Sequence, residues 1–128
     1  MRIGYYKKRK NNIKKHFHDG LKFDSKLELF FYKLLKKNKF KFEFQKPYIL
    51  LEGFRYNDKA VRKMTLTVDF YLSDLNILID TKGFQRNDNK IKWKLLKKKL
   101  YDLGETPQIY MPKTQKQCLE LITKLNEK

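Results

Sequence analysis

The chain has 128 residues, 41% of them hydrophobic, including 10 Phe and 8 Tyr, which suffices for one core in one domain. A formal net charge of +17 favours a polyanionic partner, and nucleic acid in particular. We see no long apolar run, amphipathic anchor, lipidation signal or signal peptide, so we expect no membrane partner and a cytoplasmic location. The single cysteine, Cys118, excludes an intrachain disulfide framework and a cysteine-built zinc site.

Residues 1–22 lack convincing periodicity and are interpreted as a basic N-terminal arm, with residues 23–128 forming one domain. His16 and His18 form an H-x-H pair without a third nitrogen or sulfur ligand at useful spacing, which favours a place in the arm over a zinc site. The arm is expected to add sequence-independent nucleic-acid binding through Lys7, Lys8, Arg9, Lys10, Lys14 and Lys15.

The segment 23–39, "FDSKLELFFYKLLKKNK", has apolar residues at helical spacing, with Ser25 as the N-cap. The aromatic and branched segment 40–56 predicts a strand, followed by a turn near Asn57 and Asp58. A second strand is predicted over 61–72 and a third over 75–83. Together these three strands predict an antiparallel meander.

The segment 87–104 returns to helical spacing and ends at Gly104, a C-cap glycine. "PQIYM" (107–111) predicts a short strand, and Thr114 opens a terminal helix whose apolar face includes Cys118, which we expect to pack in the core with Leu119, Ile122 and Leu125. The order of helix, strands, helix, strand and helix predicts an α/β fold with a mixed central sheet flanked by helices.

Acidic residues interrupt the central hairpin. Apolar side chains alternate with polar ones over 64–72, which predicts one core face and one polar face carrying Asp69. With a two-residue turn at Ser73-Asp74, Leu72 pairs with Leu75, Asp69 lies opposite Leu78, and Asp80 is its diagonal neighbour. Asp69, Asp80 and Lys82 then share one face, where two carboxylates could hold Mg²⁺. The alternative is a plain salt bridge from Lys82 to one acid.

The residues "VDF" and "DTKG", at 68–70 and 80–83, resemble the PD-(D/E)xK nuclease signature, with Val68 in place of its proline. The segments around them are similar in order and spacing to a small family of phage and prophage endonucleases that includes Holliday-junction resolvases. The resemblance covers about Phe23 to Tyr101. It implies a restriction-endonuclease-like α-β-β-β-α-β core.

This resemblance also implies an activity: Mg²⁺-dependent, structure-selective hydrolysis of DNA phosphodiester bonds, as in the resolution of branched recombination intermediates. Mn²⁺ is expected to substitute for Mg²⁺, and a phage-encoded enzyme would act in the bacterial host cytoplasm. Two alternatives remain open on the residues alone. One is a noncatalytic basic nucleic-acid-binding module, and the other is a sequence-specific, restriction-type endonuclease.

The site residues follow from the same resemblance. Asp69 and Asp80 would be metal ligands together with the backbone carbonyl of Thr81, and Lys82 would orient or help to deprotonate the attacking water. Glu28 matches the acid contributed by the first helix. Glu28 also fits a capping box with Ser25, which would need no catalytic role. Gln45 is an outer site residue or a surface glutamine.

DNA contacts are expected along the second long helix. Lys90, Lys94 and Lys97 form a basic stripe, near Lys98 and Tyr101, with Arg86 just before it; a solvated helix face is the alternative. The opposite face, with Ile91, Leu95 and Leu103, is expected to meet the core, and Trp93 to lie in the core or an interface. Since no base-reading element is visible, we expect the protein to recognise the backbone and the shape of the DNA. The near two-fold symmetry of a DNA junction suggests a homodimer, with the aromatics of the first hairpin and the arm as candidate contacts.

Overall fold

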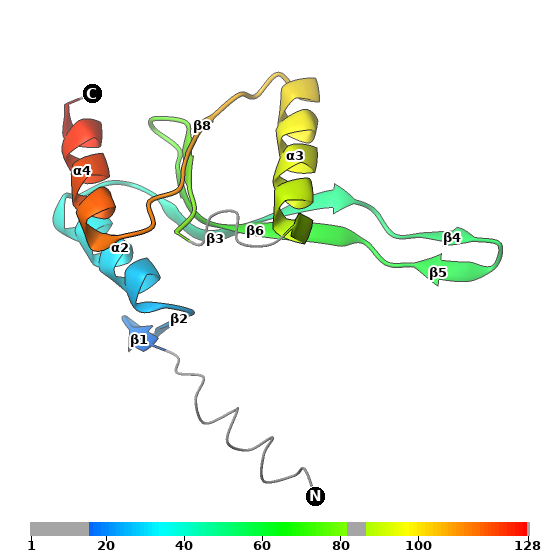
Figure 1. The fold of residues 1–128 in the computed structure, drawn as a ribbon, viewed down its shortest axis with the longest axis horizontal. Coiled ribbons are helices and arrows are strands. Elements are labelled where there is room, and N and C mark those ends of the chain that lie inside the picture. Colours follow the sequence, from blue (N-terminus) through cyan, green and yellow to red (C-terminus); the bar gives the residue numbers. More distant parts are fainter. Residues whose placement is uncertain (1–15, 82–86, 128) are drawn as a thin grey trace, which may run out of the picture.

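The computed structural model describes residues 16–81 and 87–127. Figure 1 shows the arrangement of its elements. In chain order, these are β1 (His16–His18), β2 (Leu21–Phe23), α2 (Lys26–Lys37), β3 (Glu43–Leu51), β4 (Phe54–Tyr56), β5 (Lys59–Val61), β6 (Met64–Leu72), β7 (Ile77–Ile79), α3 (Asn87–Asp102), β8 (Gln108–Tyr110) and α4 (Gln115–Asn126).

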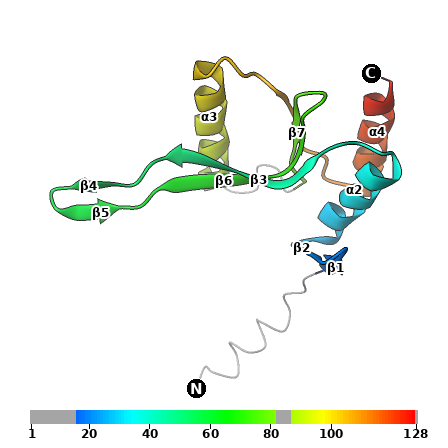
Figure 2. The same ribbon diagram turned by 180° about the vertical axis from the view of Figure 1, so that it is seen from behind.

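The central sheet has the strand order β3-β6-β7-β8. β3 pairs antiparallel with β6, and β6 with β7, whereas β7 and β8 are parallel, so the sheet is mixed. One buried cluster joins the sheet to α2 and α4, and a second joins it to α3. In Figures 1 and 2, α2 and α4 lie together at one end of the sheet, and α3 stands apart from them. The predicted α/β class with a mixed sheet is confirmed, and from α2 onward the elements alternate as helix, strands, helix, strand and helix, as predicted.

Helix α2 begins where the sequence predicts. The Ser25 hydroxyl accepts a hydrogen bond from the Glu28 backbone N–H at 3.0 Å, which satisfies one of the free amides of the first turn. Phe31, Tyr32 and Leu35 are buried on the core side of the helix. This face packs against α4 and fixes the position of the first turn of α2, from which Glu28 projects.

Helix α4 also has its predicted cap, because the Thr114 hydroxyl accepts from the Gln117 N–H at 3.1 Å. Cys118 is fully buried, as expected, and burial raises the pKa of its thiol to about 11. Leu119 is exposed instead of packing in the core, and Leu121 is buried in its place.

Residues 16–22 do not belong to a separate arm. β1 and β2 pair as an antiparallel hairpin through a turn at Asp19 and Gly20, both of which have positive φ. Phe23 is fully buried, and Leu21 packs against the same core. His16 and His18 lie in β1. The boundary expected at residue 22 is therefore corrected, because the apolar ends of this hairpin pack on α2.

β3 and β6 continue beyond the main sheet into the hairpin of β4 and β5. The turn at Asn57 and Asp58 was predicted, and both residues have left-handed φ values of 50° and 65°. Two such residues in succession suit the right-handed twist of a tight hairpin. This hairpin projects well away from the helices in both ribbon views (Figures 1 and 2).

The register of β6 and β7 differs from the one predicted. Leu72 pairs with Ile77 across a four-residue turn over 73–76, in which Asn76 has a left-handed φ of 54°. The predicted two-residue turn at Ser73-Asp74 is wrong because Asn76 supplies the left-handed residue that closes the longer turn. The shift is two residues, so the shared face is kept. Continuing the observed register brings Asp69 directly opposite Asp80 instead of diagonal to it.

The side chains of β6 do not alternate strictly between two faces. Phe70 packs in the cluster of α2 and α4, whereas Val68, two residues earlier, packs in the cluster of α3. The ladder with β3 passes from the Phe44–Phe70 pair to the Lys46–Val68 pair and omits the position between them, where Gln45 has a left-handed φ of 58°. The predicted single core face is therefore wrong, and the interruption falls at Asp69.

Helix α3 has a different orientation from the one predicted. Trp93, which was expected in the core or an interface, is buried in the core with Leu96 and Leu100. The side chains expected to face the core are exposed, by 58% for Ile91 and 62% for Leu103. Leu95 is likewise exposed. A large aromatic ring removes more apolar surface from water than these aliphatic side chains, so Trp93 decides which face is buried. No described helix has the length and apolar character needed to cross a membrane.

Candidate functional site

The buried polar and charged residues of the described ranges form one set: Glu28, Asp69, Asp80 and Thr81, each at most 6% exposed. They come from α2, from β6 and from the chain just after β7. Burying a carboxyl group is costly unless it is hydrogen-bonded, protonated or ion-paired. All four had been predicted from the sequence as site residues. The hydrogen bonds around them explain how the fold accommodates three buried acids.

The two strand acids are linked through backbone amides. Thr81 donates to Asp69 Oδ2 twice, from its backbone N–H at 2.9 Å and from its hydroxyl at 2.7 Å. In the other direction, the Asp69 N–H donates to Asp80 Oδ1 at 3.3 Å. The Asp80 N–H donates to the Tyr110 carbonyl at 3.0 Å, which ties this segment to β8. The carboxyl groups therefore occupy the point where the regular ladder of β6 is interrupted.

Glu28 joins this pair from the helix. Its Oε1 accepts from the Asp24 N–H at 2.8 Å, and its Oε2 accepts from Gln45 Nε2 at 3.5 Å. Burial, followed by the nearby charge of Asp69, raises the pKa of Glu28 to about 7. A hydrogen bond with Asp69 also raises this pKa, whereas those from Asp24 and Gln45 oppose the rise. Near neutral pH, Glu28 is therefore partly protonated.

The contacts of Glu28 bear on its capping role most directly. Ser25 caps the helix by accepting from the Glu28 backbone N–H. In a standard capping box the Glu28 carboxyl would accept from the N–H of Ser25, but here it accepts from the N–H of Asp24, one residue earlier. The other carboxyl oxygen faces the site. Gln45, although exposed as a residue, directs its amide to that oxygen. One side chain therefore caps α2 and also extends the acidic cluster.

The donor chemistry of this cluster is that of a hard divalent cation, because carboxylate oxygens are the protein ligands that Mg²⁺ and Ca²⁺ prefer. Within residues 16–81 and 87–127, however, no three His, Cys, Asp or Glu side chains are already arranged around a common metal position. Lys82 and Arg86 lie outside the described residues, as do Lys7, Lys8, Arg9 and Lys10.

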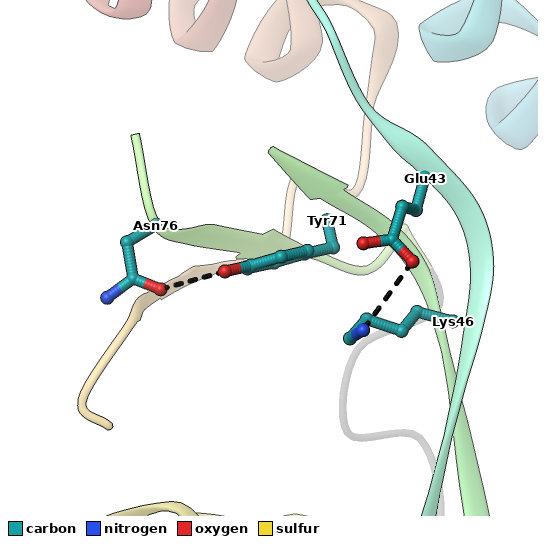
Figure 3. A network of polar contacts seen from close by, with 4 residues as sticks. All are labelled: Glu43, Lys46, Tyr71 and Asn76. Carbon is teal, nitrogen blue, oxygen red and sulfur yellow. Dashed lines mark hydrogen bonds and ion pairs between the residues drawn. The ribbon is translucent and has the colours of Figure 1, made fainter. Parts of the chain in front are cut away.

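A second polar network, which was not predicted from the sequence, joins β3, β6 and the turn before β7. Figure 3 shows Lys46 Nζ 3.5 Å from Glu43 Oε1, and the Tyr71 hydroxyl donating to Asn76 Oδ1 at 3.2 Å. Lys46 Nζ also lies 5.1 Å from the centroid of the Tyr71 ring and 5.6 Å from that of Tyr48. Burial raises the pKa of Tyr48 to about 12. The only indication of this network in the sequence was the pair of opposite charges, Glu43 and Lys46, on either side of Gln45.

Three lysines of the predicted stripe on α3, Lys90, Lys94 and Lys97, are exposed. Lys97 also lines an open pocket between the end of α3 and the chain leading into β8. The neighbouring Lys98 forms an ion pair with Asp102 at 3.0 Å. The stripe is therefore accessible to a polyanion on the side of α3 that flanks its buried face.

The chain was compared with known proteins. Residues 8–116 match the family model described as "Protein of unknown function (DUF1064)". Searches of curated proteins and of solved structures gave no significant match. The matched range includes Glu28, Asp69, Asp80 and Thr81. The chain belongs to the DUF1064 family.

Proposed function

We propose that this protein is a Mg²⁺-dependent DNA endonuclease of the PD-(D/E)xK type that hydrolyses phosphodiester bonds in branched DNA. In this proposal α2, β3, β6, β7, α3 and β8 form a restriction-endonuclease-like core. One observation carries it. The acids named by the motif and the preceding helix come from distant parts of the chain, yet they form the set of buried polar side chains described above.

Structural salt bridges alone are a poor explanation for this cluster. In a chain of net charge +17, acids can be paired with lysine at the surface at little cost, so three acids buried together need another reason. Burial and the charge of Asp69 keep Glu28 partly protonated near neutral pH, and a bound cation would favour its ionised form instead. Strongly raised pKa values of buried carboxyl groups are common at functional sites.

The proposed ligands are Asp69, Asp80, Glu28 and the Thr81 carbonyl. A bound Mg²⁺ would supply a water of lowered pKa and would stabilise the charge that develops on the phosphate. The Thr81 hydroxyl and amide hold the Asp69 carboxyl in position, and Gln45 does the same for Glu28. Lys82 is proposed to orient the attacking water, as the motif implies.

The charge distribution supports DNA as the substrate. The exposed lysines of α3 offer contacts to phosphates, and such contacts position a duplex without reading its sequence. Arg86 and the basic residues 7–10 are proposed to extend this surface. Cutting governed by DNA shape, and a homodimer that places two sites on one junction, remain parts of the proposal.

A noncatalytic nucleic-acid-binding module is the second candidate. It is favoured by the absence, among the described residues, of three acidic, histidine or cysteine side chains already arranged for a metal, and by the complete hydrogen bonding of Asp69 Oδ2 to Thr81. Such a protein would bind DNA in a salt-dependent way and would cut nothing with any divalent metal.

A substrate panel separates these functions. A four-way junction, a flap, a linear duplex and a single strand should each be incubated with the protein and Mg²⁺, Mn²⁺ or EDTA. We expect cleavage of the junction with either metal, none with EDTA, and a linear duplex left mostly uncut. Discrete fragments from linear duplex would indicate a restriction-type enzyme. Binding to every substrate without cleavage of any would contradict the nuclease proposal.

A further inference from the structure

The hairpin of β4 and β5 has no described role in the core. The two strands pair only with each other, in a separate two-stranded sheet, and residues 51–60 are all exposed. Both ribbon views show it projecting from the end of β3 and β6, away from α2 and α4 (Figures 1 and 2). We call this hairpin, residues 54–61, the projecting hairpin.

Its backbone is well defined although it stands alone. Arg55 Nη2 donates to the Asp58 carbonyl at 2.6 Å, across the left-handed turn. At its base, a Cβ on Gly53 would lie 3.3 Å from the Val61 carbonyl oxygen and 3.4 Å from the Lys63 nitrogen. The two sides of the hairpin therefore approach closely there, and glycine leaves room for this approach. The projecting hairpin is thus preorganised, which lowers the entropic cost of binding a partner.

Two aromatic rings are displayed on it. Phe54 is 47% exposed and Tyr56 is 66% exposed, and residues two apart in a strand share a face. Aromatic rings with this exposure add nothing to the core, and they raise the risk of aggregation unless they bind something. They are accompanied by cationic side chains on and next to the hairpin: Arg55, Lys59, Arg62 and Lys63.

The charge favours nucleic acid over a second copy of the chain as the occupant. Between residues 52 and 63 the only acids beside those four cations are Glu52 and Asp58, so two copies of the projecting hairpin would repel each other. Protein interfaces are depleted of charge at their centre. Aromatic rings interspersed with cations are instead typical of surfaces on which unpaired bases stack while phosphates pair with lysine and arginine.

We propose that the projecting hairpin binds DNA at a branch point, with the Phe54 and Tyr56 rings stacking on unpaired or unstacked bases. This rests on the proposed action on branched DNA and adds the element that recognises the branch. Stacking on exposed rings does not depend on base identity, which fits recognition of structure without sequence. The cations around the rings would hold the backbone of the same strand.

The test measures binding in EDTA, with no cleavage involved. A forked duplex carries 2-aminopurine at the first unpaired base, and an unforked duplex of the same length serves as the reference. We expect Phe54→Ala with Tyr56→Ala to weaken fork binding by roughly a hundredfold, about tenfold for each ring, and to change duplex binding by less than about threefold. The 2-aminopurine quenching by the wild-type protein should be lost.

Matched controls identify the cause. Phe17→Ala removes an aromatic ring that is 70% exposed on β1 and should leave fork binding unchanged. Phe54→Tyr with Tyr56→Phe keeps both rings and should keep the quenching. The emission of the buried Trp93, the single tryptophan, reports whether each variant is folded.

Three results would overturn this proposal: no change in fork binding, an equal loss on fork and duplex, or a loss accompanied by a change of oligomeric state in light scattering. The last would identify a second copy as the occupant. Failure of the nuclease proposal is distinguishable. Suppose that the wild-type protein cuts no DNA with any metal, yet replacing Phe54 and Tyr56 by alanine abolishes its fork binding. The nuclease proposal would then fail, and the stacking proposal would still hold.

Discussion

The carboxyl groups of Glu28 in α2 and Asp69 in β6 are buried close to each other, where a helix start meets an interrupted strand ladder. Burial and the charge of Asp69 raise the pKa of Glu28 to about 7. We therefore expect the cluster to respond to both protons and cations. Two of the predictions that follow use that sensitivity.

The contribution of Glu28 to protein stability should fall as pH rises from about 4.5 to 7. In the unfolded chain Glu28 ionises near its ordinary value of 4.5, whereas in the folded protein it keeps its proton up to about 7. The folded state therefore binds more protons in this window, so the free energy of unfolding decreases with pH, by on the order of 2–3 kcal/mol. Urea unfolding of the wild type and Glu28→Gln at pH 5 and pH 8 measures this.

Glu28→Gln should be more stable than the wild type at pH 8 but not at pH 5, because a buried glutamine side chain does not ionise at either pH. Glu120→Gln, at an exposed position on α4, is the matched control and should show no such difference. Parallel pH profiles for the wild type and Glu28→Gln would contradict this description of the site.

Divalent cations should stabilise the folded protein at pH 7. Mg²⁺ held by the cluster would displace the proton of Glu28, so binding should raise Tm and release protons. Thermal unfolding with and without Mg²⁺ or Mn²⁺ measures the first effect. Calorimetry in two buffers of different ionisation enthalpy measures the second.

Asp80→Asn should remove most of the metal-dependent rise in Tm, since it removes a proposed ligand. Asp74→Asn changes an exposed acid in the turn between β6 and β7 and should keep the rise. Equal stabilisation of the wild type and Asp80→Asn would show that the metal binds elsewhere.

Thr81→Val should destabilise the protein by about 1–2 kcal/mol, because the buried Asp69 Oδ2 loses the hydroxyl donor at 2.7 Å. Thr81→Ser keeps that donor and should retain most of the stability. If the nuclease proposal is right, kcat should fall in Thr81→Val more than in Thr81→Ser. Chemical denaturation gives the first quantity, and junction cleavage the second. Equal stability of the two variants would contradict the role assigned to the hydroxyl.

The orientation of α3 can be tested independently of function. Trp93→Ala should cost about 3–5 kcal/mol, because it opens a cavity among Val68, Leu78 and Leu96. Ile91→Ala and Leu103→Ala should each change the free energy of unfolding by less than about 0.5 kcal/mol, since both side chains are exposed. A larger cost for Ile91→Ala than for Trp93→Ala would support the orientation first predicted.

Much of the fold follows from local patterns. Ser25 and Thr114 mark helix starts by capping chemistry, and Asn57-Asp58 marks a hairpin turn, because those signals depend only on neighbouring residues. Asp69 and Asp80 were singled out for a similar reason, since an acid in an apolar strand is conspicuous against its immediate neighbours. Glu28 and Thr81 were named only by the resemblance to the nuclease motif.

The errors came from features set at long range. The four-residue turn depends on Asn76 adopting a left-handed φ. From the sequence alone, Ser73-Asp74 was the more obvious pair of turn residues, so the longer turn was not predicted. The break in alternation at Asp69 depends on Gln45, in another strand. In α3, aliphatic and lysine residues surround the helix, so the buried face is decided by the packing of Trp93 and not by periodicity.

The central claim is that the buried acids form a nuclease site, and the most direct measurement compares Asp80→Asn with Asp74→Asn on a four-way junction in Mg²⁺. We predict that Asp74→Asn cuts at the wild-type rate, while Asp80→Asn loses cleavage by at least about a thousandfold yet keeps its fold and its affinity for the junction in EDTA. Cleavage by folded Asp80→Asn at the wild-type rate would contradict the account.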